Sequence, residues 1–293
     1  ASTAPLYSLA ATLGYVILAV GAQAPVVFII AAIPMIFAAF AYQELNRAVP
    51  DCGTTFVWGA KAFGPITGWI GGWALAVASV MVLANVSEVT AIYFWYLVGN
   101  EGFAEDPTIV IWTAVAFIAL MTAVSVLGLP VGERMQTVLM IFQLGLLVAF
   151  GVLAFINATG GTNPDSVAFS WSWFDATQLG SWSGFMEAVL LALFIYWGWD
   201  TAVAINEETK DPEKTPGRAA VISTVLLLVT YLLVTVGAVA FAGVGDGPTG
   251  LGNEGNAGDI FAAIGPALFG DSVFGHIMMM LLAASILTSA AAS

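Results

Sequence analysis

The sequence predicts an all-α polytopic membrane protein with about eight transmembrane segments, and composition is the first observation behind this prediction. Hydrophobic residues make up 60% of the 293 residues, whereas charged residues make up only 9%. Soluble domains carry about 25% charged residues. Apolar stretches near the roughly 20 residues that a helix needs to cross a bilayer recur along the whole chain. We therefore expect the lipid bilayer to surround most of this protein.

The second observation is the position of the basic residues. All six Lys and Arg residues fall in three connections between apolar stretches, and these connections alternate with acidic ones. They are Arg47, Lys61, Arg134, Lys210, Lys214 and Arg218. Because short basic loops are retained in the cytoplasm, we predict that these connections are cytoplasmic. The protein is then a multi-pass protein of the cell (plasma) membrane.

The apolar stretches, taken in order, give the predicted helices. Their approximate limits are 4–20, 24–43, 66–98, 108–128, 136–156, 182–205, 219–243 and 272–293. A helix rises about 1.5 Å per residue, so the third stretch is long enough to tilt or to extend beyond the hydrocarbon layer. Between the last two stretches, the apolar piece Ile260–Phe269 is expected to form a short helix on the outer surface.

Composition also limits the function classes. The net charge of −13 disfavours nucleic acid as a partner, because like charges repel. With one Cys and one His, the chain offers neither an internal disulfide nor a cysteine metal cluster. A membrane-embedded enzyme needs a His, Cys or paired-acid constellation, and a channel needs a ring of like charges or a repeated filter sequence. Neither pattern occurs, so we expect a protein that is not an enzyme and has no cofactor.

Acidic residues inside apolar stretches are costly in lipid and mark candidate functional sites. Three such residues occur, Glu88, Glu187 and Asp200. Asp200 lies near the middle of the sixth stretch, beside Gly198, which two tryptophans flank. Glycine tolerates non-helical backbone, so we predict a helix break at 197–200 whose freed backbone groups line a cavity. The alternative is that the glycine permits close helix packing and the aspartate bonds a neighbouring hydroxyl.

Several runs of sequence carry a resemblance to a known family. Residues 198–219 read GWDTAVAINEETKDPEKTPGRA, a glycine followed by an acidic pair, a basic residue and two prolines. Residues 44–58 are followed by Phe-Gly at 63–64 and Gly-Trp at 72–73. These runs resemble the sixth helix with its exit, and the loop after the second helix, of the amino acid/polyamine/organocation (APC) transporter superfamily.

The resemblance covers nearly the whole chain. A third similarity is Leu-Gly-Leu at 127–129 with Arg134 and Gln136. The departures are mild, with Thr54 where the family often has a second glycine and Phe56 where tyrosine is common. The chain is thus similar to an amino acid permease. It is expected to be a fragment that runs from the outer half of the family's first helix to its eighth.

This resemblance implies a fold and a function. The fold is a leucine-transporter-like one with inverted five-helix repeats, here a single domain 1–293 truncated at both ends. Its first repeat covers about 1–156 and the start of its second about 182–293. The implied function is secondary active transport of amino acids or related amines, by alternating access around broken first and sixth helices. The alternatives are a polyamine or organic cation exchanger and a non-transporting truncated membrane scaffold.

The resemblance also implies a substrate site. The break of the first helix lies at its start, and the sixth-helix break forms the opposite wall, with Phe194 closing over the substrate from outside. The third helix flanks the site, although its polar residues also suit a packing hydrogen bond between helices. The substrate-binding residues are then Ser2, Thr3, Ala4, Pro5, Asn85, Glu88, Phe194, Tyr196, Trp197, Gly198, Trp199 and Asp200.

The coupling ion stays open. Ser285, Thr288 and Ser289 share one helix face, and similar positions in sodium-coupled relatives of the fold supply ion ligands. Such hydroxyls also bond their own helix backbone. Proton coupling would instead use a carboxylate such as Asp200 or Glu88, and exchange without an ion is the third alternative.

Overall fold

The computed structural model describes residues 5–126, 132–270, 275 and 277–284, and within them the chain is helical and contains no strand. The described part also includes the helical stretch 277–284 and short 3₁₀ turns. The predicted all-α class is therefore confirmed. The α-helices are α1 (Pro5–Val20), α2 (Ala24–Ala48), α3 (Thr54–Phe63), α4 (Pro65–Val98), α5 (Glu101–Glu105), α6 (Pro107–Val126), α7 (Gly132–Thr159), α8 (Trp182–Tyr196), α9 (Thr201–Ala204), α10 (Thr215–Ala242) and α11 (Ile260–Phe269).

The chain is a multi-pass membrane protein. Five stretches of the described residues are long and apolar enough to cross a bilayer: Pro5–Ala48, Pro65–Val98, Met140–Thr159, Trp182–Ala204 and Thr215–Ala242. Large apolar side chains are exposed along the helices, among them Trp69 (60%), Trp73 (58%) and Trp112 (69%). Exposed apolar surface on this scale suits lipid contact rather than water.

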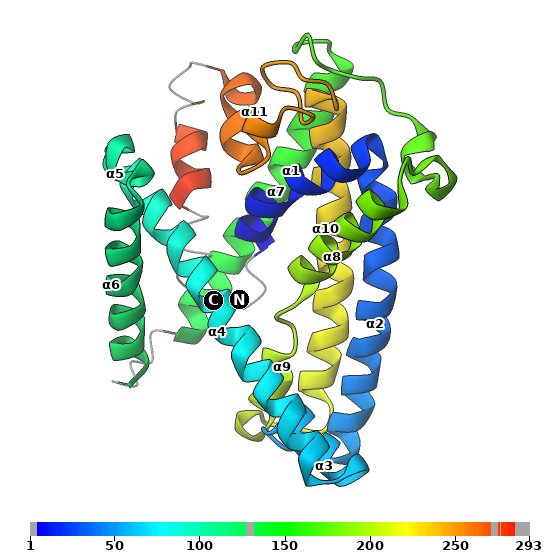
Figure 1. The fold of residues 1–293 in the computed structure, drawn as a ribbon, viewed down its shortest axis with the longest axis vertical. Helices are drawn as coiled ribbons and strands as arrows, with labels where there is room; N and C mark the ends of the chain where they lie inside the picture. The colour runs from blue at the N-terminus through cyan, green and yellow to red at the C-terminus, as the bar shows by residue number, and fades with distance from the viewer. Residues whose placement is uncertain (1–4, 127–131, 271–274, 276, 285–293) are drawn as a thin grey trace.

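The first of these stretches consists of two helices. Val20 leaves helical geometry (φ −130°, ψ 1°), and the 3₁₀ turn η1 (Gly21–Gln23) joins α1 to α2. Figure 1 shows that α1 runs obliquely from the middle of the molecule to this turn, from which α2 descends along the whole bundle. The predicted division between 4–20 and 24–43 is confirmed.

Helices α2 and α10 stand upright in Figure 1, and α10 packs on both α2 and the slanted α7. Glycines allow this close packing. A Cβ added to Gly237 of α10 would come within 2.4 Å of the Gly151 carbonyl oxygen of α7, and one added to Gly217 would come within 2.8 Å of the Gln43 Cα atom of α2. Small residues at such crossings let helix backbones approach in membranes.

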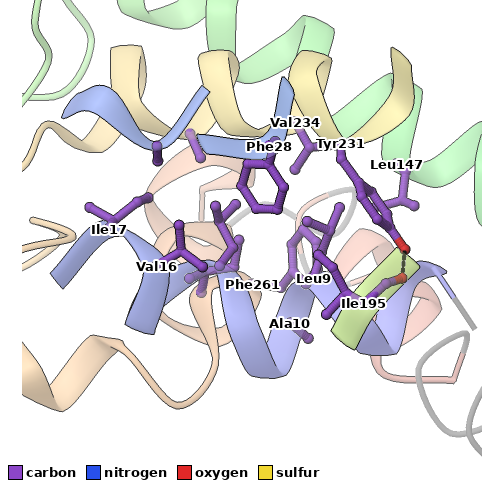
Figure 2. Close-up of a cluster of buried hydrophobic side chains, with 14 of the residues drawn as sticks. Leu9, Ala10, Val16, Ile17, Phe28, Leu147, Ile195, Tyr231, Val234 and Phe261 are labelled. Atoms are coloured by element: carbon purple, nitrogen blue, oxygen red, sulfur yellow. Dashed lines mark hydrogen bonds between the residues drawn. The ribbon is translucent and has the colours of Figure 1, made fainter. Parts of the chain in front are cut away.

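The main hydrophobic core joins the oblique helices to the upright ones. Figure 2 shows Leu9 of α1, Phe28 of α2, Ile195 of α8 and Tyr231 of α10 converging, with Phe261 of α11 on the same cluster. All five side chains are at most 2% exposed. This cluster therefore holds the first part of α1 and the last turn of α8 in place inside the molecule.

A second, smaller core holds the other end of the bundle. It gathers Ala39, Trp58, Val203 and Ala220 from α2, α3, α9 and α10 and Trp199 from the turn before α9, with Tyr42 packed against it. The Tyr42 ring makes edge contacts with both tryptophans, at centroid distances of 5.1 Å to Trp58 and 5.0 Å to Trp199.

Two basic connections meet beside this second core. The Asn206 side chain donates to Asn46 Oδ1 at 2.6 Å, and Asn46 Nδ2 donates to the Pro212 carbonyl at 2.6 Å. The Cys52 amide donates to Glu207 Oε1 at 3.2 Å. The connections that hold Lys61 and Lys210 therefore lie at one end of the bundle, as the alternation of charge requires. The side of the membrane that they face stays a prediction.

Thr54 has an unusual backbone at the start of α3. Its φ of 39° lies in the left-handed region, which non-glycine residues rarely adopt. This is the position where the resembling family often has glycine, so the backbone gives a physical reason for that preference.

The short helix predicted at Ile260–Phe269 is confirmed as α11 with the same bounds. Its residues Ile260, Phe261 and Ile264 are fully buried in the main core, so it packs into the bundle rather than lying on its surface. The last predicted segment, 272–293, falls within the described residues only at 275 and 277–284.

The packing of α7 on α10 can be tested with Gly237→Ala. The added methyl group would overlap the Gly151 carbonyl, and overpacking of this kind costs about 1–3 kcal/mol. We expect a lower thermal unfolding midpoint in detergent. Gly145→Ala, on α7 with no atom within 4 Å of the added Cβ, is the control and should not destabilise. Equal midpoints for both variants would contradict this packing.

The predicted topology can be tested at Cys52, which is exposed. In a variant whose only cysteine is Cys52, a membrane-impermeant maleimide should not react in sealed cells and should react after permeabilisation. A Gly255→Cys variant without Cys52 should show the reverse, because position 255 is exposed in an acidic connection. Labelling of Cys52 in sealed cells would overturn the orientation.

Candidate functional site

The sixth predicted segment is broken where the sequence predicts. Helix α8 ends at Tyr196, Trp197 is extended (φ −72°, ψ 158°), and α9 begins only at Thr201. Gly198 has φ 114°, a conformation that residues with a Cβ rarely adopt. The helix break at 197–200 is therefore confirmed.

The carbonyl groups freed at the end of α8 find partners. The Trp197 amide donates to the Phe194 carbonyl at 3.2 Å, and the Tyr231 hydroxyl of α10 donates to the Ile195 carbonyl at 3.0 Å, the dashed line in Figure 2. Beyond the break, the Val203 amide donates to the Asp200 carbonyl at 2.9 Å and starts α9. A break inside a membrane is stable only with such replacements.

The start of α1 lies against this break. Helices α1 and α8 pack on each other, and Figure 1 shows both ending near the middle of the molecule. Tyr231 contacts the Ser8 side chain of α1 as well as the Ile195 carbonyl of α8. One buried hydroxyl thus links the ends of the two oblique helices.

The third-helix candidates lie next to α1. The Tyr7 hydroxyl donates to Asn85 Oδ1 of α4, and Glu88 is close enough to act electrostatically on Tyr7. Asn85 and Glu88 are both exposed. Pro5 is buried at the start of α1. The structure therefore brings these α4 residues to the start of α1, where the predicted site has its first wall.

Two of the predicted aromatic residues pack into the protein interior. The Tyr196 side chain is fully buried and its hydroxyl donates to the Phe28 carbonyl at 3.2 Å. Trp199 belongs to the second core, and within the described residues its indole Nε1 is buried without a hydrogen-bond partner. Phe194, by contrast, is 47% exposed on the last turn of α8. Their substrate roles stay predictions.

Asp200 lies at the start of α9 and is half-buried. Its carboxyl group interacts with the Trp197 side chain and with backbone groups of Gly198 and Thr201, although it does not cap α9 with a side-chain hydrogen bond. Tyr42 of α2 is also close enough to feel its charge. The carboxylate therefore sits within the break itself, and its role toward substrate stays a prediction.

The other candidates lie outside the described residues. They are Ser2, Thr3 and Ala4 of the predicted first break and Ser285, Thr288 and Ser289 of the predicted ion site. Among the described residues, no group of three or more His, Cys, Asp or Glu side chains could hold a metal ion.

Sequence reasoning missed the tyrosines that organise the site. Tyr7 and Tyr231 are at most 5% exposed and both use their hydroxyls to join different helices. A signal for them exists, because a buried tyrosine in an apolar helix needs a hydrogen-bond partner. The sequence alone does not identify that partner.

Comparison with known proteins agrees with this architecture. Residues 2–293 match the amino acid permease family model. The chain is 26% identical over 220 residues to the branched-chain amino acid permease BcaP of Lactococcus lactis subsp. cremoris, a match that covers 71% of this chain and 46% of that protein. It is 28% identical over 221 residues to the low-affinity putrescine importer PlaP of Escherichia coli K12, covering 71% and 45%.

A third relative is the methylthioribose transporter of Bacillus subtilis, 24% identical over 221 residues, with 71% and 45% covered. The chain thus spans about half the length of the curated relatives that it matches. Its multi-pass helical fold, its broken sixth segment and the family match over nearly its whole length lead to one conclusion: this chain belongs to the amino acid permease family.

Proposed function

We propose that the protein containing this chain is a secondary active transporter of amino acids or related amines that works by alternating access around the helix break. The observation that carries the proposal is the interruption between Tyr196 and Thr201, which lies against the start of α1. Interrupted helices near the middle of a bilayer are where secondary transporters bind substrates and coupling ions.

The two sides of the break suit the two ends of an amino acid. A helix N-terminus has a partial positive charge that attracts a carboxylate, and a helix C-terminus has a partial negative charge that attracts an amine. Helix α8 presents its C-terminus, and α1 presents its N-terminus, near the middle of the molecule. Asp200 adds a carboxylate that can act on the substrate amine or on a coupling proton.

The relatives support the substrate class without defining it. One is named for branched-chain amino acids and another for putrescine, and both kinds of solute carry amino groups. The name of the putrescine importer favours a polyamine as the substrate, as in the second candidate, a polyamine or organic cation exchanger, but it does not speak for exchange. A scaffold without transport is the remaining alternative, and uptake assays of the full-length protein in proteoliposomes separate the three.

The role of Asp200 can be tested with Asp200→Asn, which keeps the shape and removes the charge. Uptake of the transported amine by the full-length protein should fall about tenfold, the equivalent of about 1.4 kcal/mol. A change in the pH dependence would assign Asp200 to the coupling proton, and an unchanged pH dependence with weaker substrate affinity would assign it to the amine.

The matched control is Asp246→Asn, which makes the same substitution at an exposed residue of an acidic connection and should leave uptake unchanged. If the Asp200→Asn variant kept the uptake and the pH dependence of the wild type, the Asp200 charge would have no role, and only the backbone groups of the break would remain as candidates for substrate binding.

The hydroxyl that links the helix ends can be tested with Tyr231→Phe. The substitution leaves the Ile195 carbonyl buried without this donor, and an unsatisfied buried group costs about 1–3 kcal/mol. We expect a lower unfolding midpoint together with slower uptake. Tyr15→Phe removes a hydroxyl from a residue that is 47% exposed and should be neutral. Equal behaviour of the two variants would show that Tyr231 acts through packing alone.

A further inference from the structure

Two cavities lie on the α11 side of the molecule, away from the helix break. One has a volume of about 590 Å³ between α4, α11 and the stretch 277–284, and the other has about 530 Å³ between α1, α4 and residues 255–263. Residues 197–200 line neither cavity. Both volumes fall in the range of about 300–1,000 Å³ that is typical of small-molecule sites. Their shared lining consists of Tyr93, Tyr96, Asp259 and Ala262.

Asp259 lines both cavities, and only some of the hydrogen-bond acceptor positions of its carboxylate are occupied. Its Oδ1 accepts hydrogen bonds from the Phe261 amide at 3.0 Å and the Ala262 amide at 3.1 Å, which caps α11. Its Oδ2 accepts the Tyr93 hydroxyl of α4. A carboxylate has about four acceptor positions, so these three donors leave capacity for another. None of the three donors carries a full positive charge, so only the partial charge of the α11 N-terminus offsets the carboxylate.

No Lys or Arg is encoded in the elements around this carboxylate, and the chain's one His, His276, lies outside the described residues. Residues 1–46, 62–133 and 219–293 contain neither Lys nor Arg, and these ranges include every element that lines the two cavities. Burial accordingly raises the pKa of Asp259, although the bonds from Tyr93 and from the start of α11 oppose that rise. A buried carboxylate stays ionised readily only beside a positive charge. Within the described residues neither cavity is lined by a basic side chain, and a cation from solution can supply the positive charge.

The aromatic lining suits an organic cation. The rings of Tyr93 and Tyr96 meet edge to face, with centroids 6.1 Å apart and planes at 88°. Ammonium groups bind the faces of such rings within about 6 Å. Beyond the rings, one cavity continues along Met279, Met280 and Leu282, which can cover an apolar carbon chain.

A metal ion fits less well. Calcium takes about six to eight oxygen ligands, and Asp259 is the only carboxylate that lines either cavity within the described residues. An anion would meet an uncompensated negative charge. Recognition by one carboxylate and two aromatic rings instead matches a group that combines positive charge with apolar surface.

We propose that Asp259, Tyr93 and Tyr96 form a binding site for an organic ammonium ion, separate from the helix break. The ammonium group donates to Asp259 Oδ2 and lies against the tyrosine rings, and its carbon chain occupies one of the two cavities. Because Tyr93 belongs to α4 and Asp259 precedes α11, the ligand binds where these two elements join. Binding of a ligand at this site does not depend on transport, so the proposal goes beyond the proposed function.

The test is isothermal titration of the full-length protein in nanodiscs with n-butylammonium chloride. Asp259→Asn should weaken binding at least tenfold, and Tyr96→Ala at least threefold. Asn can still accept the two amide hydrogen bonds that begin α11, so the fold should persist, which the unfolding midpoint checks. Asp246→Asn removes an equal charge from an exposed residue that lines neither cavity and should bind like the wild type.

Several outcomes would overturn the site. One is that the wild type and Asp259→Asn bind n-butylammonium with equal affinity. Another is that the neutral analogue 1-butanol binds as tightly as n-butylammonium. A third is that sodium chloride at the same concentration abolishes n-butylammonium binding, which would assign the site to an inorganic cation. Titration of Asp200→Asn separates this site from the helix break, because Asp259-dependent binding should survive there. Binding without uptake would refute only the proposed function, and uptake without Asp259-dependent binding would refute only this site.

Discussion

The structure depends on one constraint, which is that backbone groups freed inside a nonpolar environment must find partners. Breaking the helix between Tyr196 and Thr201 frees such groups at the centre of the molecule. The buried hydroxyl of Tyr231 accounts for one of them by bonding the Ile195 carbonyl, and its contact with Ser8 attaches α1 to the same point. Helix α10 thus stabilises the interruption that α8 creates.

The break also separates the two hydrophobic cores. Helix α8 packs into the main core through Ala188, Ala192 and Ile195, whereas α9 packs into the second core through Val203, with Trp199 beside it. Only a few non-helical residues join these parts of one predicted segment. Helices α2 and α10 contribute residues to both cores. The molecule therefore has two packing units on a continuous frame.

Much of this fold follows from local features of the sequence. Apolar length predicts the helices, Gly198 between two tryptophans predicts the break, and Asp259 before an apolar run is a typical start for α11. The contacts of Tyr7 with Asn85 and of Tyr231 with Ile195 join residues far apart in the chain, and no local pattern encodes them. The same limit explains Trp199, whose neighbours suggest a cavity wall but whose ring packs against Tyr42. The inverted repeat and the ion site stay predictions.

The extended conformation of Trp197 and the positive φ of Gly198 have a mechanical consequence. A continuous helix resists bending because each turn is bonded to the next, so reorienting one half would break hydrogen bonds in between. Here no helical bond crosses from α8 to α9. Reorienting α9 relative to α8 would therefore break no hydrogen bond of either helix, and what holds α9 in place is the packing of Val203 in the second core. The extended Trp197 and the positive φ of Gly198 therefore mark the point at which the two helices can change their relative orientation.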